Sequence, residues 1–287
     1  MDSIGEKGVA MKTSKRWVLM LLTVCMLFSL SACSWLGIEG RLNPISTQKT
    51  ASAITALVRS QPFPEQYYDA VIYDPEVVFD PNQLLEALTH LRIKPGYTLD
   101  FVYYLDFGFD TGYSIVYSHK TSEPRFETVE EYQAQLGECD PDLNPTSCEC
   151  TDFIETDGTK AGYFEFVLFD IMRYQIYRIG HAQYGENEVI TSKARLDVLS
   201  EEIGSPPEAG SYSWGNPFTD QQKRRIRQID PVPRVIILDE EVTVRVVIFS
   251  RWGGFYEVTV TLAPDMPHTI LNIDLKNLIM YDCGIMF

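Results

Sequence analysis

The residues best suited to acid–base chemistry are carboxylates in an aromatic stretch of the chain. From Leu99 onward apolar residues alternate with others, and Asp100, Asp106 and Asp110 all occupy the second set of positions. Residues at such positions share one face of a β-strand. Two facing carboxylates can hydrolyse a glycoside as acid and base or nucleophile. We therefore take Asp106 and Asp110, with Asp100 or Glu165 as partner, as weak catalytic candidates; the alternative is a solvated acidic face.

A short motif in the same stretch suggests a second chemistry. Asp110-Thr111-Gly112 resembles the active-site turn of aspartic proteases, in which two aspartates share a proton and activate water. Tyr113 stands where that family needs a small residue, and no second such motif occurs in the sequence. We interpret the motif as a hairpin turn, for which Asp and Gly are common.

An acidic loop offers hard oxygen ligands. Asp140, Asp142 and Asn144 alternate as at the start of a calcium loop, but Pro145 and Thr151 occupy positions where an EF-hand needs Gly and Glu. They are weak calcium ligands, and a solvated loop is the alternative.

The cysteines fall mainly in the same loop. Cys139, Cys148, Cys150 and Cys283 could form two disulfides in an exported protein. A bond between Cys148 and Cys150 is disfavoured by the usual Cα separations. We expect Cys139 to pair with one of these two and Cys283 with the other; the alternative is a zinc site.

Other catalytic motifs are missing from the sequence. The four histidines have no metal-ligand spacing, and there is no nucleophile elbow, phosphate loop or dinucleotide fingerprint. The basic run Lys223 to Arg227 spreads around a helix and is expected to face water. We expect no cofactor and favour a protein that is not an enzyme.

Helical patterns occur at five places. Apolar spacing predicts a helix over residues 47–59, and Asp80-Pro81 starts another with apolar positions up to Leu91. Thr128 with Glu131 forms a capping box for a helix ending near residue 136. Further helices are expected at about 192–203 and 219–229.

Strand patterns cover most of the remainder. We expect a hairpin of residues 99–109 and 113–117, a long aromatic β segment over 163–179, and strands at 235–238, 242–249, 255–262 and 278–283. In the second hairpin, the alternate residues Val242 to Ile248 should match Tyr256 to Leu262. The fold class is α+β: an antiparallel sheet of hairpins covered by helices on one face, with a small disulfide-pinned loop.

The composition of the chain limits the classes of partner that it can bind. The 287 residues carry 24 Lys and Arg against 40 Asp and Glu, a net charge of −16, which repels nucleic acids. Exposed aromatic residues such as Tyr212, Trp214 and Trp252 could form a protein-binding surface. The alternative is that they pack within the domain.

The N-terminal residues indicate export. Lys12, Lys15 and Arg16 precede an apolar run of residues 17–30 that is too short for a transmembrane helix and typical of a signal peptide. Either Met1 or Met11 is the start, and Met11 gives the more basic leader.

The end of the apolar run is more specific. Leu30-Ser31-Ala32-Cys33 resembles the lipobox of bacterial lipoproteins, a resemblance that covers residues 11–33. It implies cleavage before Cys33, acylation of that cysteine, palmitate included, and attachment to a membrane by more than one acyl chain. In the enteric-bacterial pattern, Asp at the position after the lipidated cysteine retains lipoproteins at the inner membrane. This sequence has Ser34 there, which favours the outer membrane if the envelope has one.

The domain organisation follows. Residues 1–32 are the signal peptide, 33–61 a lipid-anchored tether and 62–287 a single α+β domain, with a split near residues 205–215 as the alternative. We expect a cell-envelope lipoprotein with a non-catalytic binding or scaffolding role toward an envelope protein or glycan. The alternatives are an envelope hydrolase that uses the acidic strand face and a calcium-stabilised adhesion or assembly module.

Overall fold

The computed structural model describes residues 40–61, 79–106, 111–136, 152–178, 187–203, 216–250 and 253–281. Residues from Arg41 to Phe287 form one compact unit, distinct from the preceding forty. Helices and antiparallel sheets both occur in it, so the predicted α+β class is confirmed. No helix of the described residues has the length and apolar character needed to cross a membrane.

Five strands form the main antiparallel sheet. These are β5 (Asn187–Ile190), β6 (Arg234–Ile237), β7 (Val242–Ser250), β8 (Gly254–Leu262) and β9 (Ile270–Met280). The order is β5-β7-β8-β9, and β6 also pairs with β7. Since β8 occupies one edge of β7 along its whole length, β5 and β6 follow one another along the other edge.

The β7–β8 hairpin has the register that its sequence predicts. Val246 lies opposite Val258, and Ile248 lies opposite Tyr256. The turn depends on Gly254, whose φ of +93° suits glycine and whose missing Cβ allows the Ile279 carbonyl to approach. The alternating apolar residues therefore build one continuous buried face.

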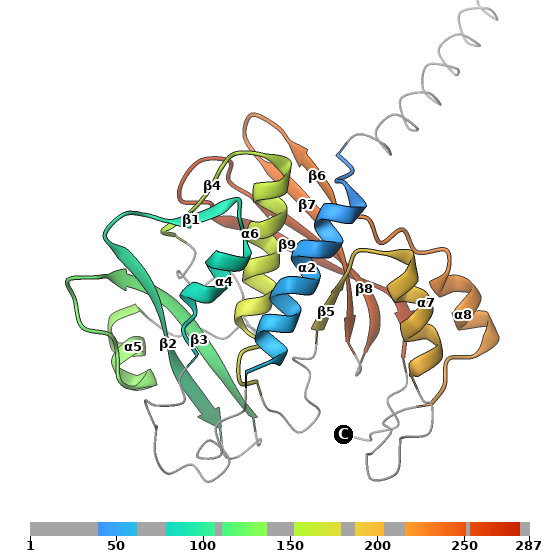
Figure 1. Ribbon diagram of the computed structural model, residues 1–287, viewed down its shortest axis with the longest axis horizontal. Coiled ribbons are helices and arrows are strands. Elements are labelled where there is room, and N and C mark those ends of the chain that lie inside the picture. Colours follow the sequence, from blue (N-terminus) through green and yellow to red (C-terminus); the bar gives the residue numbers. More distant parts are fainter. Residues whose placement is uncertain are drawn as a thin grey trace, which may run out of the picture. The chain divides into compact units, whose positions relative to one another are not determined.

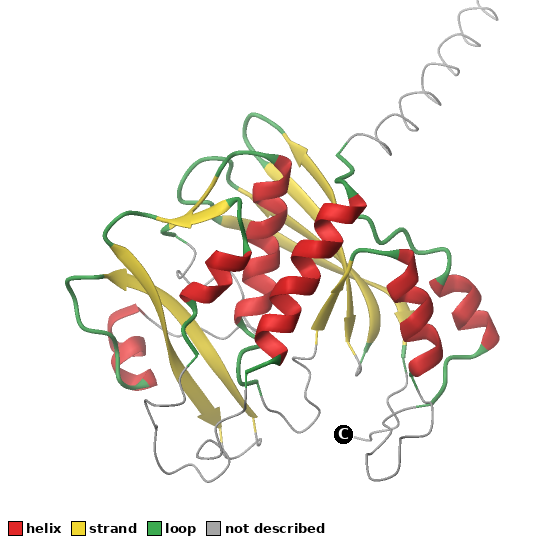
Figure 2. Ribbon diagram, viewed as in Figure 1, coloured by secondary structure: helices red, strands yellow, loops and turns green. Residues whose placement is uncertain are grey.

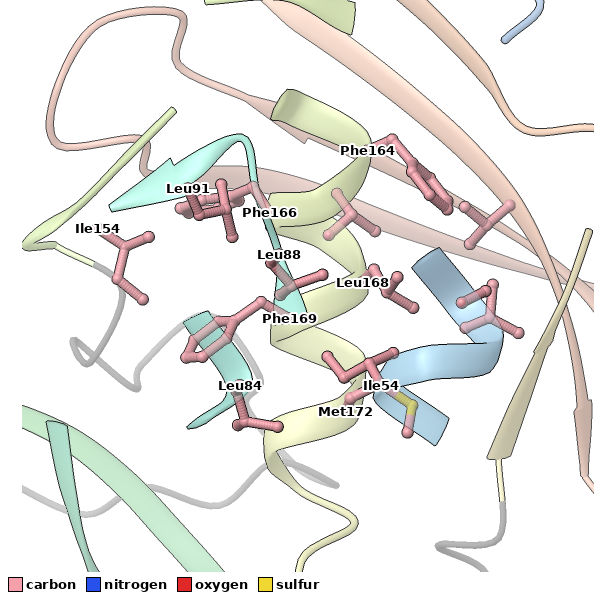
Figure 3. Packing of buried hydrophobic residues seen from close by; sticks show 14 of the residues in the cluster. Ile54, Leu84, Leu88, Leu91, Ile154, Phe164, Phe166, Leu168, Phe169 and Met172 are labelled. Atoms are coloured by element: carbon pink, nitrogen blue, oxygen red, sulfur yellow. The ribbon is translucent and has the colours of Figure 1, made fainter. Parts of the chain in front are cut away.

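Two long helices, α2 (Pro44–Arg59) and α6 (Lys160–Arg173), lie side by side over that face (Figures 1 and 2). Figure 3 shows α6 at the centre of the core, with Phe164 toward the sheet, Met172 near Ile54 of α2, and Phe169 near Leu84. The short helix α4 (Asn82–Ala87) and the two-stranded sheet of β1 (Leu91–Ile93) and β4 (Ile154–Thr156) pack on the same core. The largest apolar cluster thus surrounds α6.

The prediction of a β segment over residues 163–179 was wrong, because this stretch begins as helix α6. Thr159 caps the helix by accepting a hydrogen bond from the Gly162 N–H at 3.1 Å. Nearly every side chain of the helix is buried, from Tyr163 through Arg173. A helix buried on all sides has no polar stripe, so its period is hidden and its aromatic residues mimic a strand.

Two further helices cover the end of the opposite face. Helices α7 (Lys193–Glu202) and α8 (Asp220–Ile226) pack with Val247, Phe249 and Phe255 in a second apolar cluster. Ser192 caps α7, and Thr219 caps α8. The helices are therefore not confined to one face as predicted: α2 and α6 cover one side, and α7 and α8 part of the other.

The predicted N-terminal hairpin is present as β2 (Tyr97–Asp106) and β3 (Thr111–Lys120). Its second face is not simply acidic and partly exposed as expected. Val102, Ile115 and Tyr117 are buried there with Tyr132 of helix α5 (Val129–Leu136), in a third apolar cluster. Both faces of the hairpin are covered, because the alternate positions of β2 include Val102 as well as aspartates.

Two of the predicted boundaries differ clearly from those in the structure. Helix α4 ends at Ala87, and Leu91 begins β1, because the intervening His90 N–H is donated to Glu165 of α6. The last strand begins at Ile270 and not at Leu278. Its first part includes Asn and Asp, which have low strand propensity.

Helix α2 belongs to the core and not to a tether. Asn43 caps it through a hydrogen bond from the Ile45 N–H at 2.9 Å, and Ala51, Ile54 and Val58 are buried. Just before the helix, the Leu42 N–H donates to the Pro233 carbonyl at 3.1 Å. The part of the expected tether that precedes the compact unit is therefore residues 33–40.

Candidate functional site

Asp100 and Asp106 are too far apart along β2 to act as a catalytic pair. Asp100 and Asp106 lie six residues apart on β2. At the rise of a β-strand their Cα atoms are about 20 Å apart, whereas the two carboxyl groups of a glycosidase lie within about 10 Å. The Asp106 side chain and Asp110 lie outside the described residues, so their own pairing stays a prediction.

Asp100 is occupied by neighbours of the hairpin. Its carboxylate lies 3.9 Å from His119 Nε2 and 4.0 Å from Arg125, and it also accepts the Phe101 N–H at 2.8 Å. About a fifth of the side chain is exposed. These contacts give Asp100 a role in holding the hairpin to the segment that leads into α5.

Several predicted sites lie outside the described residues. They are the acyl acceptor Cys33, the calcium candidates Asp140, Asp142 and Asn144, the four disulfide candidates Cys139, Cys148, Cys150 and Cys283, and the aromatic residues Tyr212, Trp214 and Trp252. Within the described ranges, no three His, Cys, Asp or Glu side chains are grouped as metal ligands.

The basic run of helix α8 faces carboxylates of α7. Lys223 forms an ion pair with Glu201 at 2.5 Å, and Arg227 lies 3.5 Å from the same residue. Arg225 donates to the Leu278 carbonyl at 2.8 Å. The run therefore joins α8 to α7 and β9.

A polar cluster brings His90, Asp157 and Glu165 together. His90 Nδ1 lies 2.7 Å from Asp157 Oδ2, and the His90 backbone N–H donates to Glu165 Oε2 at 2.7 Å. The Asp157 N–H in turn donates to the His90 carbonyl at 3.1 Å. Two segments far apart in the sequence are thereby joined at the beginning of α6.

Local sequence explains the position of Asp157. Gly158 has a φ of +75°, which allows the chain to turn directly into the helix. Asp157 Oδ1 accepts hydrogen bonds from the Thr159 N–H at 3.0 Å and from its hydroxyl at 2.6 Å. A Cβ on Gly162 would lie 2.5 Å from the same oxygen, so a glycine is needed beneath this carboxylate.

The electrostatics of the cluster couple its members. The hydrogen bond that His90 donates to Asp157 raises the pKa of His90, and burial offsets part of the rise. Burial raises the pKa of Asp157, but its hydrogen bonds from His90 and Thr159 outweigh this and hold the pKa below the ordinary value. Burial raises the pKa of Glu165, which is 3% exposed.

The cluster has half of the arrangement needed for nucleophilic catalysis. A histidine oriented by a carboxylate can serve as a general base for a hydroxyl or thiol. Among the described residues, no such group is hydrogen-bonded to His90 Nε2. These contacts hold the loop before β1 against α6.

A second histidine fastens another loop. His268 is buried, and its Nε2 accepts the Thr156 N–H at 3.3 Å while Nδ1 lies 3.3 Å from the Ala263 carbonyl. Its ring meets Tyr163 and Phe166 edge-on. Burial lowers its pKa, which favours the neutral ring that these contacts require.

Sequence reasoning missed the site made by His90 and Asp157. These residues lie 67 positions apart, and no spacing rule joins them. The local signal was Asp157-Gly158-Thr159 before Gly162, which is a turn and a helix cap. Glu165 was considered only as a strand carboxylate.

Comparisons with known proteins give no relative. No protein family matches the chain. No similar curated protein and no similar solved structure was found.

Proposed function

We propose that this chain is a lipoprotein of a bacterial cell envelope, anchored through Cys33, whose domain binds or scaffolds an envelope protein or glycan without catalysis. The sequence support is the lipobox-like Leu30-Ser31-Ala32-Cys33 after a basic and apolar leader. Export and lipid attachment both follow from that resemblance.

One observation carries the proposal further: the compact unit begins eight residues after Cys33, at Arg41. The backbone of Arg41 forms an isolated antiparallel β-bridge with Arg234 of β6, and the Arg41 guanidinium donates a hydrogen bond to Asp230 at 2.9 Å. Eight residues of extended chain span no more than about 29 Å. An acylated Cys33 would therefore hold the β6 end of the domain close to the membrane.

The charge of the chain supports a covalent anchor over adsorption. Cleavage before Cys33 removes four of the 24 basic side chains and two of the 40 acidic ones, which leaves a net charge of −18. Anionic lipids repel such a protein. Acyl chains supply the attachment that the surface charge cannot.

The arrangement of polar groups favours binding over hydrolysis. Asp100 is held by His119 and Arg125, and His90 is hydrogen-bonded to Asp157 beside a buried Glu165. Each of these contacts links two segments of the fold. These charged groups therefore stabilise the fold, which supports a binding domain.

The anchor is tested by metabolic labelling with an alkyne analogue of palmitate and by membrane fractionation. The wild-type chain should carry the label and sediment with membranes, and Cys33→Ser should do neither. Cys25→Ser is the matched control because it changes a thiol within the same leader, and it should behave as wild type. Label that persists in Cys33→Ser would contradict the anchor.

The non-catalytic role is tested on lipoprotein purified from membranes with a panel of glycans and envelope polymers. A ligand at a hundred times its dissociation constant stabilises the native state by about 2.7 kcal/mol, which thermal unfolding detects. Stabilisation by a panel member with no change in its mass supports binding. Conversion of any member to a product, seen by mass spectrometry, would contradict it.

A further inference from the structure

The outer edge of β9 is a long strand edge. Among the described strands, β9 pairs only with β8, and it extends over eleven residues. Side chains of α8 bind its last part, where the Leu278 and Met280 carbonyls accept hydrogen bonds from Arg225 and Gln222. Leu271, Leu275 and Met280 are 55%, 58% and 74% exposed. The edge of a sheet presents backbone N–H and C=O groups that can pair with another strand.

We propose that two copies of this chain join edge to edge through β9, antiparallel about a two-fold axis at Leu275. The two five-stranded sheets would then form one continuous sheet. In this register Asp274 lies directly opposite Lys276 of the second copy, and the same pair recurs across the axis. The partner is thus identified as the chain itself.

The charges of β9 select this register. A two-fold axis normal to the sheet keeps the faces of both copies aligned, so residues opposite one another are both even or both odd in number. Moving the axis by one residue places Asp274 opposite Asp274, or Lys276 opposite Lys276. Like charges directly opposite are unfavourable, whereas opposite charges stabilise a strand pair.

A row of charges on the same face of the sheet leads to this edge. Arg245 of β7 forms an ion pair with Glu257 of β8, and Glu257 lies 3.9 Å from Lys276 of β9. The signs alternate along the row, and Asp274 of the second copy would continue the alternation. Among the described residues, Lys276 has this single ion pair, and Asp274 has none.

The local geometry of the strand allows the contact. Its register with β8 is regular from Asn272 to Asn277, between irregularities at Leu271 and Leu278. Leu275 would meet its own copy on the opposite face from the charges. A lysine on an edge strand ordinarily hinders pairing, but here Asp274 two residues away offsets it.

The dimer supplies a partner for the binding role proposed above, and its place at a membrane rests on that proposal. The contact itself needs no lipid anchor. Fractionation of each sample shows whether the anchor is intact, so the two proposals can fail separately.

The experiment is disulfide crosslinking of the full chain in membranes, with Leu275→Cys oxidised by copper phenanthroline. Residues directly opposite have Cα atoms about 4.5 to 5.5 Å apart, within the range of a disulfide. A covalent dimer above the wild-type background is expected. Asn272→Cys is the matched control, because its two copies would be about 20 Å apart along the strand, and it should give none. Equal yields from the two variants, or none from either, would overturn the proposal.

A charge exchange in the Leu275→Cys background tests the register. Asp274→Lys faces Lys276 of the second copy with another cation and should reduce the dimer yield severalfold. Adding Lys276→Asp restores opposite charges and should restore the yield, even though this aspartate lies near Glu257. Resistance to a protease verifies folding of both variants. An unchanged yield in Asp274→Lys, or no recovery in the double variant when it is folded, would overturn the register.

Discussion

Gly162 lies beneath Asp157 so closely that a Cβ on the glycine would be 2.5 Å from the carboxylate oxygen. Glycine usually weakens a helix by about 1 kcal/mol relative to alanine. Here its absence of a side chain makes room for the acceptor that holds Thr159 and, through its other oxygen, His90. One contact therefore joins the start of α6 to the loop before β1.

Gly162→Ala should destabilise the domain by about 1 kcal/mol, despite the better helix propensity of alanine. The Cβ displaces Asp157 Oδ1 from its hydrogen bonds with Thr159. Chemical unfolding of the purified lipoprotein measures the effect. Lys160→Ala, at an exposed position of the same helix turn, is the control and should change little. A stabilised Gly162→Ala variant would show that the carboxylate is not held where we describe it.

The contact between His90 and Asp157 should make the stability of the domain depend on pH. Its pKa is raised in the folded state by the hydrogen bond with Asp157, so its contribution is complete below about pH 6.5 and disappears as the pH rises through the folded value. The difference in unfolding free energy between wild type and His90→Gln should therefore be larger at pH 6 than at pH 9. Asp157→Asn should reduce the same pH dependence. A constant difference would contradict the pair.

His268 should give the opposite pH dependence of stability to His90. Burial lowers its pKa, so the unfolded chain binds a proton more readily, and stability is lost as the pH falls below about 6.5. His268→Phe keeps the ring contacts with Tyr163 and Phe166 but leaves the Thr156 N–H without its acceptor. We expect a loss of about 1–3 kcal/mol at neutral pH and a shallower decline on acidification. An unchanged acid slope would contradict this role.

Glu188 of β5 should contribute more to the stability of the domain than a residue of an exposed ion pair does. Arg195 of α7 holds it with two guanidinium hydrogen bonds, and Arg59 of α2 adds a third at 3.3 Å. Burial raises the pKa of Glu188, but these arginines outweigh it and leave the pKa lowered. Glu188→Gln should cost about 1–3 kcal/mol, because the hydrogen bonds that join the three elements lose their charged acceptor. Glu201→Gln, whose side chain is 57% exposed, is the matched control and should change stability little. Equal effects would contradict the argument from burial.

The sequence predicted those elements whose signals are local. The β7–β8 register follows from strict alternation around Gly254, and helices α7 and α8 begin at Ser192 and Thr219, where the sequence predicts their starts. Helix α6 was missed because burial on all sides removes the polar stripe from which a helical period is read. The cluster of His90, Asp157 and Glu165 depends on tertiary packing that no short motif encodes.

Lipid anchoring is tested most directly by the mass of the mature N-terminal peptide from protein extracted from bacterial membranes. We expect a chain that begins at Cys33 and carries a thioether-linked diacylglycerol, with or without a further amide-linked acyl chain. Its release from the membrane should require detergent. A mature chain that begins elsewhere, or an unmodified Cys33, would contradict lipid anchoring and with it the placement of this domain at a membrane surface.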